Sequence, residues 1–274
     1  MNFSAKDALP FIAMADVHAD VFDNADAPWY KFSAQDYWRR NYRELQEEDH
    51  EIIGRVSRFF IHAFADRPLA RRGVDVGSGT NLYPALLMLP WTDQILLTDF
   101  SASNIRWLRH QLADDSPEWT WLPFWREMRE AKGYNVVDRP RELLREACTS
   151  EPGFAGIEQC SVFDLPKAQW DLGTMFFVAE SITEMPEEFR AAVARFVGAL
   201  TPGAPFAAAF MAGSDGYPVA RAVFPGLRIT PEDVMRHLTV LGAREPSVEL
   251  LKTSHRVRDG YAGMIVATGF VGNQ

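Results

Sequence analysis

Short apolar runs alternate with helix-forming segments along much of this chain. Residues 73–76 and 94–100 are two such runs, and turn-forming or charged residues bound each of them, which is typical of buried strands. The segment 81–89 between them predicts a helix. Ser101 can cap a second helix, with Asn104 in its first turn. This β-α-β-α order favours a parallel, doubly wound sheet.

The same alternation continues in the second half of the chain. Helices are predicted from Pro186 and after the capping box Thr230–Asp233, and Gly242 is a suitable terminator for the second of these. Five further strands are predicted, at 156–162, 170–178, 205–211, 246–253 and 263–270. Together these elements predict an α/β fold of Rossmann-like type, a doubly wound and mostly parallel seven-stranded sheet with helices on both faces.

Two segments stand outside this alternation. Residues 1–40 have mixed polarity and predict an N-terminal arm that acts as a lid, with a helix that begins at the capping box Ser33–Asp36. An arm packed permanently on the domain is the alternative. Residues 114–156 contain two helix-like runs and predict a helical insertion over one end of the sheet. Because we find no linker and no repeat, we expect residues 1–274 to form a single domain.

Composition narrows the class of protein. The net charge of -9 argues against nucleic-acid binding, which needs clustered Lys and Arg. The two cysteines, Cys148 and Cys160, lack the C-x-x-C spacing of a zinc or redox site and are expected to be reduced thiols. No apolar run is long enough to span a membrane, and the first residues do not resemble a signal peptide. We therefore expect a cytoplasmic protein, as a monomer or homodimer, that binds no membrane.

The loop Gly77–Gly79 follows the first predicted strand, where ligands of open α/β sheets bind. Asp99 ends the second strand and can accept hydrogen bonds from the hydroxyls of a ribose. This geometry suits both NAD and S-adenosylmethionine (SAM), and an ordinary tight turn is the simplest alternative. Dinucleotide folds need a third glycine in G-x-G-x-x-G, and Leu82 occupies that position here. SAM has no pyrophosphate, so it fits this loop better than NAD.

Several motifs resemble one enzyme family. They are DVGSGTNLYPALL, LLTDFSASNIRWL, EWTWLP, DYWRRNY and LTPGAPFAAAF, spread from Asp36 to about His237. They are similar to motifs of the nicotinamide, phenylethanolamine and indolethylamine N-methyltransferase family, and most similar to bacterial, actinomycete-like members. The resemblance implies a class I methyltransferase that uses SAM and releases S-adenosylhomocysteine (SAH).

The resemblance also implies roles for individual residues. Two tyrosines would close over SAM, the glycine-rich loop would lie under its amino-acid part, a third tyrosine would bind the carboxylate, and the acid and aromatic after the second strand would bind ribose and adenine. Each tyrosine of the first pair could instead be a surface residue, and the aromatic could belong to the core. The expected cofactor residues are Tyr37, Tyr42, Asp75, Gly77, Ser78, Gly79, Tyr83, Asp99, Phe100, Asn104, Ser161 and Val162.

The chain departs from the family at two places. The family has C-D-V after its third strand, where this chain has Cys160-Ser161-Val162, so Ser161 would contact adenine and Asp164 is a nearby substitute. Met211 stands where the family has an acid that binds the substrate amine. Candidates for a catalytic role near the expected active-site mouth are Glu180, Asp215, Tyr217 and, on the arm, His18. Asp171 and Glu180 do not make a metal cluster, so no metal is expected.

These observations predict methyl transfer from SAM to a nitrogen or oxygen of a small, largely apolar or aromatic acceptor, by in-line displacement in a water-poor pocket. The acceptor pocket is expected between the arm, the insertion and the loops after the fourth and fifth strands, lined by Trp119, Trp121, Trp125, Phe176, Phe177, Met211 and Tyr217. A non-catalytic SAM-binding regulator or partner protein of the same fold is one alternative. A nicotinamide-dependent oxidoreductase is the other, and Leu82 argues against it.

Overall fold

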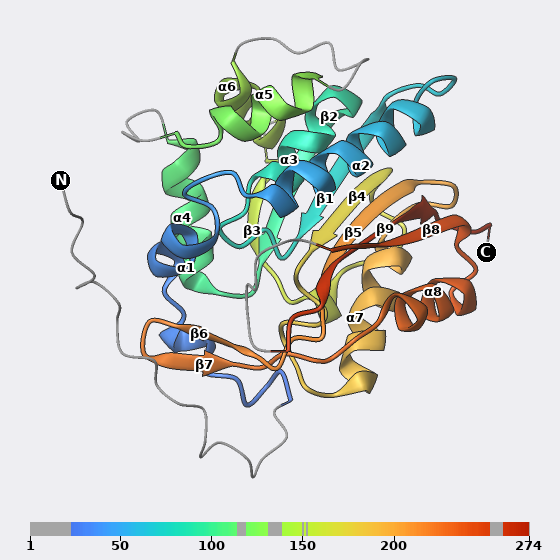
Figure 1. The fold of residues 1–274 in the computed structure, drawn as a ribbon. Coiled ribbons are helices and arrows are strands. Elements are labelled where there is room, and N and C mark those ends of the chain that lie inside the picture. Colours follow the sequence, from blue (N-terminus) through green and yellow to red (C-terminus); the bar gives the residue numbers. More distant parts are fainter. Residues whose placement is uncertain are drawn as a thin grey trace, which may run out of the picture.

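A seven-stranded sheet forms the centre of the computed structural model (Figure 1). The structure describes residues 23–113, 119–130, 139–149, 151, 153–252 and 260–273. The sheet strands are β1 (Ala70–Val76), β2 (Thr92–Asp99), β3 (Ile157–Gln159), β4 (Leu172–Phe176), β5 (Pro205–Ala212), β8 (Arg244–Leu251) and β9 (Gly263–Phe270). All seven correspond to strands predicted from the sequence.

The strand order is β3-β2-β1-β4-β5-β9-β8. Neighbours from β3 to β5 are parallel, and β9 is antiparallel to both β5 and β8. The predicted doubly wound, mostly parallel sheet is therefore confirmed. Along the chain, β1, β2 and β3 extend the sheet in one direction, whereas β4 and β5 extend it in the other. This reversal between β1 and β4 opens a crevice at their carboxyl ends, where ligands bind in such sheets.

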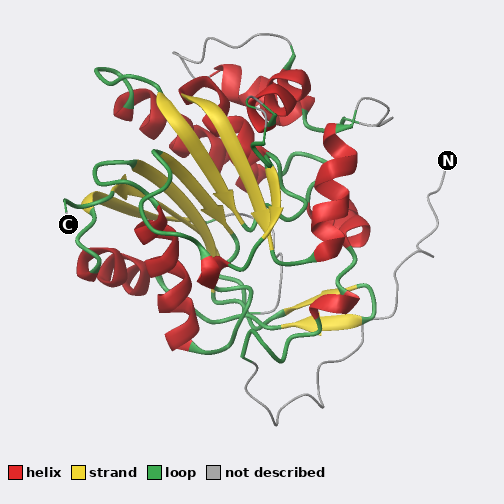
Figure 2. Ribbon diagram, turned by 180° about the vertical axis from the view of Figure 1, so that it is seen from behind, coloured by secondary structure: helices red, strands yellow, loops and turns green. Residues whose placement is uncertain are grey.

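Helices cover both faces of the sheet (Figure 2). Within the described residues they are α1 (Ala34–Asn41), α2 (Glu47–Ala63), α3 (Tyr83–Met88), α4 (Ala102–Leu112), α5 (Leu122–Glu130), α6 (Pro140–Cys148), α7 (Pro186–Ala199) and α8 (Pro231–Val240). Side chains of a strand alternate between faces, so Ile95 and Leu97 pack in the cluster formed with α2 to α6, while Leu96 packs in the cluster formed with α7 and α8. None of the described helices has the length and apolar character needed to cross a bilayer.

Three of the four residues predicted to cap or terminate a helix do so in the structure. The Thr230–Asp233 capping box opens α8, and Gly242 follows its end with a φ of 73°, as predicted. The Ser33 side chain accepts the Asp36 N–H at the start of α1, also as predicted. Ser101 lies at the N-cap of α4, but its side chain makes no capping bond. That hydroxyl lies instead at a pocket described below.

Two differences from the sequence prediction lie at strand ends. The third strand is only Ile157–Gln159, because Ser161 accepts the Phe163 N–H and caps the 3-10 turn η3 (Val162–Asp164). The hairpin formed by β6 (Tyr217–Val219) and β7 (Ala222–Phe224) was not predicted. Its strands have three residues each, too few to show an alternating pattern. Figure 1 shows the hairpin beside α1, below the sheet.

The insertion contains two helices, as predicted, but it lies elsewhere. Helix α5 packs against α2 and α3, and α6 packs against β2, so both cover one face of the sheet rather than its end. The aromatic side chains Trp121, Phe124 and Trp125 explain this position, because they are almost completely buried in the core. Burying such large apolar surfaces is worth several kcal/mol in total, at about 25 cal/mol per Å².

Candidate active site

The glycine-rich loop after β1 needs its glycines for conformation and for space. Gly77 and Gly79 have φ angles of 66° and 56°, in the left-handed region where side chains are disfavoured. A Cβ atom on Gly77 would also overlap the side chain of Val178. Ser78 fixes the loop on the sheet, since its N–H donates to the Thr98 carbonyl at 2.8 Å and its hydroxyl to the Asp75 carbonyl at 3.0 Å. The loop is thereby held as a rigid floor at the crevice.

Asp99 lies opposite this loop at the end of β2. Its Oδ1 accepts the Ser101 N–H at 2.7 Å and the Asn104 amide at 3.0 Å, and its Oδ2 accepts the Gly79 N–H at 2.9 Å. Burial raises the pKa of Asp99 to about 6, although these three donors oppose the shift. A carboxylate has about four acceptor positions. One position therefore remains for a ligand hydroxyl.

A pocket of about 800 Å³, partly open to solvent, lies between the loop and Asp99. Most of the cofactor residues predicted from the sequence line it, together with the catalytic candidate Tyr217. Those predicted residues are Tyr37, Tyr42, Gly77, Ser78, Gly79, Asp99, Phe100, Asn104, Ser161 and Val162. The sequence motifs thus converge on one pocket.

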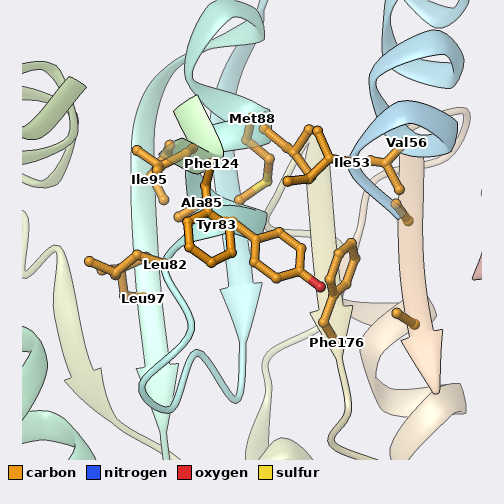
Figure 3. Packing of buried hydrophobic residues seen from close by; sticks show 14 of the residues in the cluster. Ile53, Val56, Leu82, Tyr83, Ala85, Met88, Ile95, Leu97, Phe124 and Phe176 are labelled. Carbon is orange, nitrogen blue, oxygen red and sulfur yellow. The ribbon is translucent and has the colours of Figure 1, made fainter. Parts of the chain in front are cut away.

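Two predicted cofactor residues do not line the pocket. Asp75 is buried within β1, where its Oδ1 accepts the Thr174 hydroxyl at 2.7 Å and burial raises its pKa to about 7. Tyr83 is fully buried between Phe124 and Phe176 (Figure 3), stacking on the first with ring centroids 5.7 Å apart. Neither side chain reaches the pocket, because β1 is buried on both faces and Tyr83 begins α3 on the side that packs in the core. These residues support the pocket from beneath.

Of the catalytic candidates, only Tyr217 lines the pocket, and its hydroxyl donates to the Ser181 carbonyl at 3.2 Å. Glu180 is fully buried and accepts the Met211 N–H at 2.9 Å, so it joins the ends of β4 and β5. Asp215 forms a bidentate ion pair with Arg228 away from the pocket. His18 lies outside the described residues. Among the described candidates, the structure thus places Tyr217 at the pocket and engages Glu180 and Asp215 in contacts within the protein.

Four polar atoms at the pocket could hold a ligand, and of their residues only Asn104 was predicted from the sequence as a cofactor contact. They are buried, belong to residues lining the pocket, and have no hydrogen-bond partner among the described residues: Thr80 Oγ1, Asn81 Nδ2, Ser101 Oγ and Asn104 Oδ1. Leaving a buried polar atom unpaired costs about 1–3 kcal/mol, so these atoms fit a polar ligand. Their signal in the sequence was position alone, directly after the Gly77–Gly79 loop or after Asp99.

Aromatic side chains from two distant segments cover the pocket. Trp29 contributes from the 3-10 turn η1 (Trp29–Lys31) and Phe32 follows it, while Tyr217 and Phe224 come from the β6–β7 hairpin. The Trp29 and Phe224 ring centroids are 5.2 Å apart, and those of Phe32 and Phe224 are 5.1 Å apart. Trp29 also meets the half-exposed ring of Phe100 edge-on, at 6.5 Å. The described part of the predicted arm thus lies over the pocket.

The three tryptophans expected in an acceptor pocket line neither of the two pockets described here. Trp121 and Trp125 belong to the core, and Trp119 packs beneath the guanidinium of Arg141. Of the predicted acceptor residues, Phe177 and Met211 line a second pocket of about 800 Å³. It adjoins the first, because Tyr37, Tyr42 and Phe177 line both. Phe177 has a φ of 60°, which is strained for a bulky residue.

SAM fits the first pocket in its chemistry. Asp99 offers an acceptor to a ribose hydroxyl, the exposed Phe100 ring offers a face to adenine, and Thr80 and Asn81 offer polar atoms to the amino-acid part. A third glycine in the loop between β1 and α3 serves the close approach of a pyrophosphate, which SAM does not have. Leu82 can therefore occupy that position, where its side chain is fully buried in the core.

The fold is similar to those of solved methyltransferases at low sequence identity. N-methyltransferase NodS from Bradyrhizobium japonicum WM9, solved with SAH, is 13% identical, with a TM-score of 0.49 over 87% of this chain and 93% of that chain. An amino pentose methyltransferase from Micromonospora echinaspora, solved with SAM, is 15% identical, with a TM-score of 0.47 over 85% and 96%. A 1,6-didemethyltoxoflavin-N1-methyltransferase from Burkholderia thailandensis is 14% identical, with a TM-score of 0.45 over 87% and 82%.

A comparison with curated proteins finds no match. The model of the NNMT/PNMT/TEMT family matches residues 21–263, which is most of the 274-residue chain. This range includes the glycine-rich loop, Asp99 and the hairpin. The chain therefore belongs to the NNMT/PNMT/TEMT family of class I SAM-dependent methyltransferases.

Proposed function

We propose that this methyltransferase transfers the methyl group of SAM to a nitrogen or oxygen of a small, largely apolar or aromatic acceptor. The observation that carries the proposal is the pair of adjoining pockets, which share the side chains of Tyr37, Tyr42 and Phe177. The first has the polar groups that a nucleoside needs. The second adds Met211 and Met264, two buried thioether side chains that suit an apolar body.

The chain's own residues bind and orient both reactants in this proposal. Asp99 accepts a ribose hydroxyl, Phe100 stacks on adenine with Ser161 and Val162 at its edge, and the Gly77–Gly79 loop carries the amino-acid part. When bound, SAM supplies an electrophilic methyl group on a sulfonium. Holding an acceptor atom in line with that group removes most of the entropic barrier of a bimolecular reaction.

Exclusion of water is the second contribution of the protein. Trp29, Phe32 and Tyr217 cover part of the pocket with apolar surface, and Phe224 packs behind them. A dry site favours the reaction because the sulfonium loses its charge in the displacement, and water stabilises the charged reactant more than the transition state. In this proposal the described part of the arm, residues 23–40, acts as a lid, since Trp29, Phe32 and Tyr37 line the pocket.

The direct test is SAH formation by the purified protein with SAM and a panel of aromatic amines, phenols and N-heterocycles. Product analysis by mass spectrometry then shows whether nitrogen or oxygen carries the methyl group. Acceptor-dependent SAH formation supports the proposal. Tight binding of SAM with no turnover across the panel would instead support a non-catalytic SAM-binding protein.

A further inference from the structure

The second pocket contains an acidic pair that the apolar acceptor does not use. Glu48 and Asp49, in the first turn of α2, line this pocket together with Met211 and Met264. Both acids are buried, with exposed fractions of 4% and 5%. Charged side chains are seldom buried to this degree without a partner.

The existing contacts leave the pair incompletely satisfied. Glu48 Oε1 is buried and has no hydrogen-bond partner in the described part of the chain. The Asp49 carboxylate accepts the Gln46 N–H at 3.1 Å as part of the capping box of α2. Burial raises the pKa of Asp49 to about 7. The Gln46 N–H opposes the shift, the charge of Glu48 adds to it, and the Tyr83 hydroxyl and His50 oppose it more weakly. The pair therefore retains at least one buried acceptor, Glu48 Oε1, that a cationic donor in the pocket could use.

Nearby cationic side chains are engaged elsewhere. Arg40 also lines the pocket, but it is exposed and donates to the Pro218 carbonyl at 3.4 Å. His50 follows the pair on α2, where its Nδ1 lies 2.8 Å from a Glu127 oxygen. Neither forms an ion pair with Glu48 or Asp49 among the described residues.

We propose that Glu48 and Asp49 bind a positively charged nitrogen group of the acceptor, and so select an acceptor with an aromatic or apolar body and one cationic group. The inference rests on the proposed function, because the same pocket is taken as the acceptor site. It revises the expectation drawn from Met211, since α2 supplies the charge that β5 lacks. The body lies against Met211, Met264 and Phe177, and the cation lies at the start of α2.

Matched pairs of probes separate charge from shape. A panel of arylalkylamines, such as 2-phenylethylamine, is compared with the alcohols of the same carbon skeletons, such as 2-phenylethanol. Calorimetry or ligand-observed NMR gives the affinity of each for the SAH-loaded protein near neutral pH. We expect at least one amine to bind about ten-fold or more tightly than its alcohol, as for a charge-assisted hydrogen bond.

Variants of the two acids then test whether these side chains cause the preference for amines. Glu48→Gln and Asp49→Asn keep size, and the Asn side chain can still accept the Gln46 N–H. Each is expected to reduce the amine-to-alcohol ratio by several-fold, and the double variant to bring it close to one. Glu47→Gln, at the neighbouring exposed acid on the same turn, is the control and should leave the ratio unchanged.

The outcomes distinguish this inference from the proposed function. SAH affinity is measured first in every protein, and lack of SAH binding by the wild type refutes the proposed function itself. If SAH binds but no amine is preferred over its alcohol, only the acidic-pair proposal is wrong. It is also wrong if the preference survives in the folded Glu48→Gln, Asp49→Asn double variant.

Discussion

Replacement of Asp99 by alanine tests the cofactor assignment most directly. Three of the four acceptor positions of this carboxylate are taken by the N–H groups of Ser101 and Gly79 and by the Asn104 amide. The remaining position can accept one ribose hydroxyl. A hydrogen bond to a charged group contributes about 1.5–3 kcal/mol. Asp99→Ala should therefore weaken SAH binding by about 10- to 150-fold at 25 °C.

The assay is isothermal titration with SAH, which binds without reacting. Asp93→Ala is the control, because Asp93 is an exposed aspartate at the opposite end of β2. Thermal melting and circular dichroism establish that each variant is folded, since Asp99→Ala also removes three internal hydrogen bonds. A folded Asp99→Ala protein with wild-type SAH affinity would refute the ribose assignment.

The pH dependence of SAH binding gives a second measure of the same residue. The pKa of Asp99 is raised to about 6 by burial, so the carboxylate gains a proton as the pH falls through that value. Protonation weakens it as an acceptor, and SAH affinity should fall below about pH 6. This loss should be much smaller in Asp99→Ala. An identical pH profile in the two proteins would contradict the reasoning.

Three further predictions follow from the loop, the sheet and the arm. Gly77→Ala should reduce SAH affinity about ten-fold or more and lower the melting temperature, because of its φ of 66° and the overlap with Val178, whereas Gly198→Ala, with no neighbour within 4 Å, should not. The raised pKa of Asp75, about 7 when folded against 3.8, means that its contribution to stability is present at low pH and is lost as the pH rises through 7. We therefore expect the unfolding free energy of Asp75→Asn, measured by denaturant titration, to rise relative to that of the wild type by at least about 1.4 kcal/mol between pH 5 and pH 8. A difference between the two proteins that stays constant with pH would contradict this. Limited proteolysis within residues 23–40 should slow when SAH and an acceptor bind, and equal cleavage rates in both states would count against a lid.

The fold was predictable because its signals are local and repeated. The central strands β2, β4, β5 and β9 are short apolar runs, and the caps of α1 and α8 are formed by residues three positions apart. The cofactor pocket was predictable for a related reason. Its floor and its acid come from two motifs that are brought together by a single β-α-β unit, so their positions along the chain fix their positions in space.

The predicted site residues that lie away from the pockets are those for which the direction of the side chain, rather than its type, decides its contacts. Tyr83 and Asp75 lie within the cofactor motifs, yet both point into the core, because β1 is covered on both faces and α3 packs on the sheet. Asp215 and Glu180 have the chemistry of a base, but Arg228 and the backbone of Met211 engage them. Sequence spacing carries no information about such partners. The tryptophans of the insertion line neither pocket for the same reason.

The second pocket, proposed as the acceptor site, illustrates why substrate class is harder to predict than cofactor. Its lining comes from the start of α2, the end of β5 and the start of β9, so Glu48 and Met264 are separated by most of the chain. These segments meet only because the sheet order reverses at β1 and β4, which brings the ends of β4 and β5 under the loop that joins α1 to α2. A carboxylate missing from β5 can therefore be replaced from α2 without any change in the recognisable motifs. Met211 alone predicted an apolar pocket, whereas Met211 beside two buried acids indicates an amphipathic one, and that difference exists only in three dimensions.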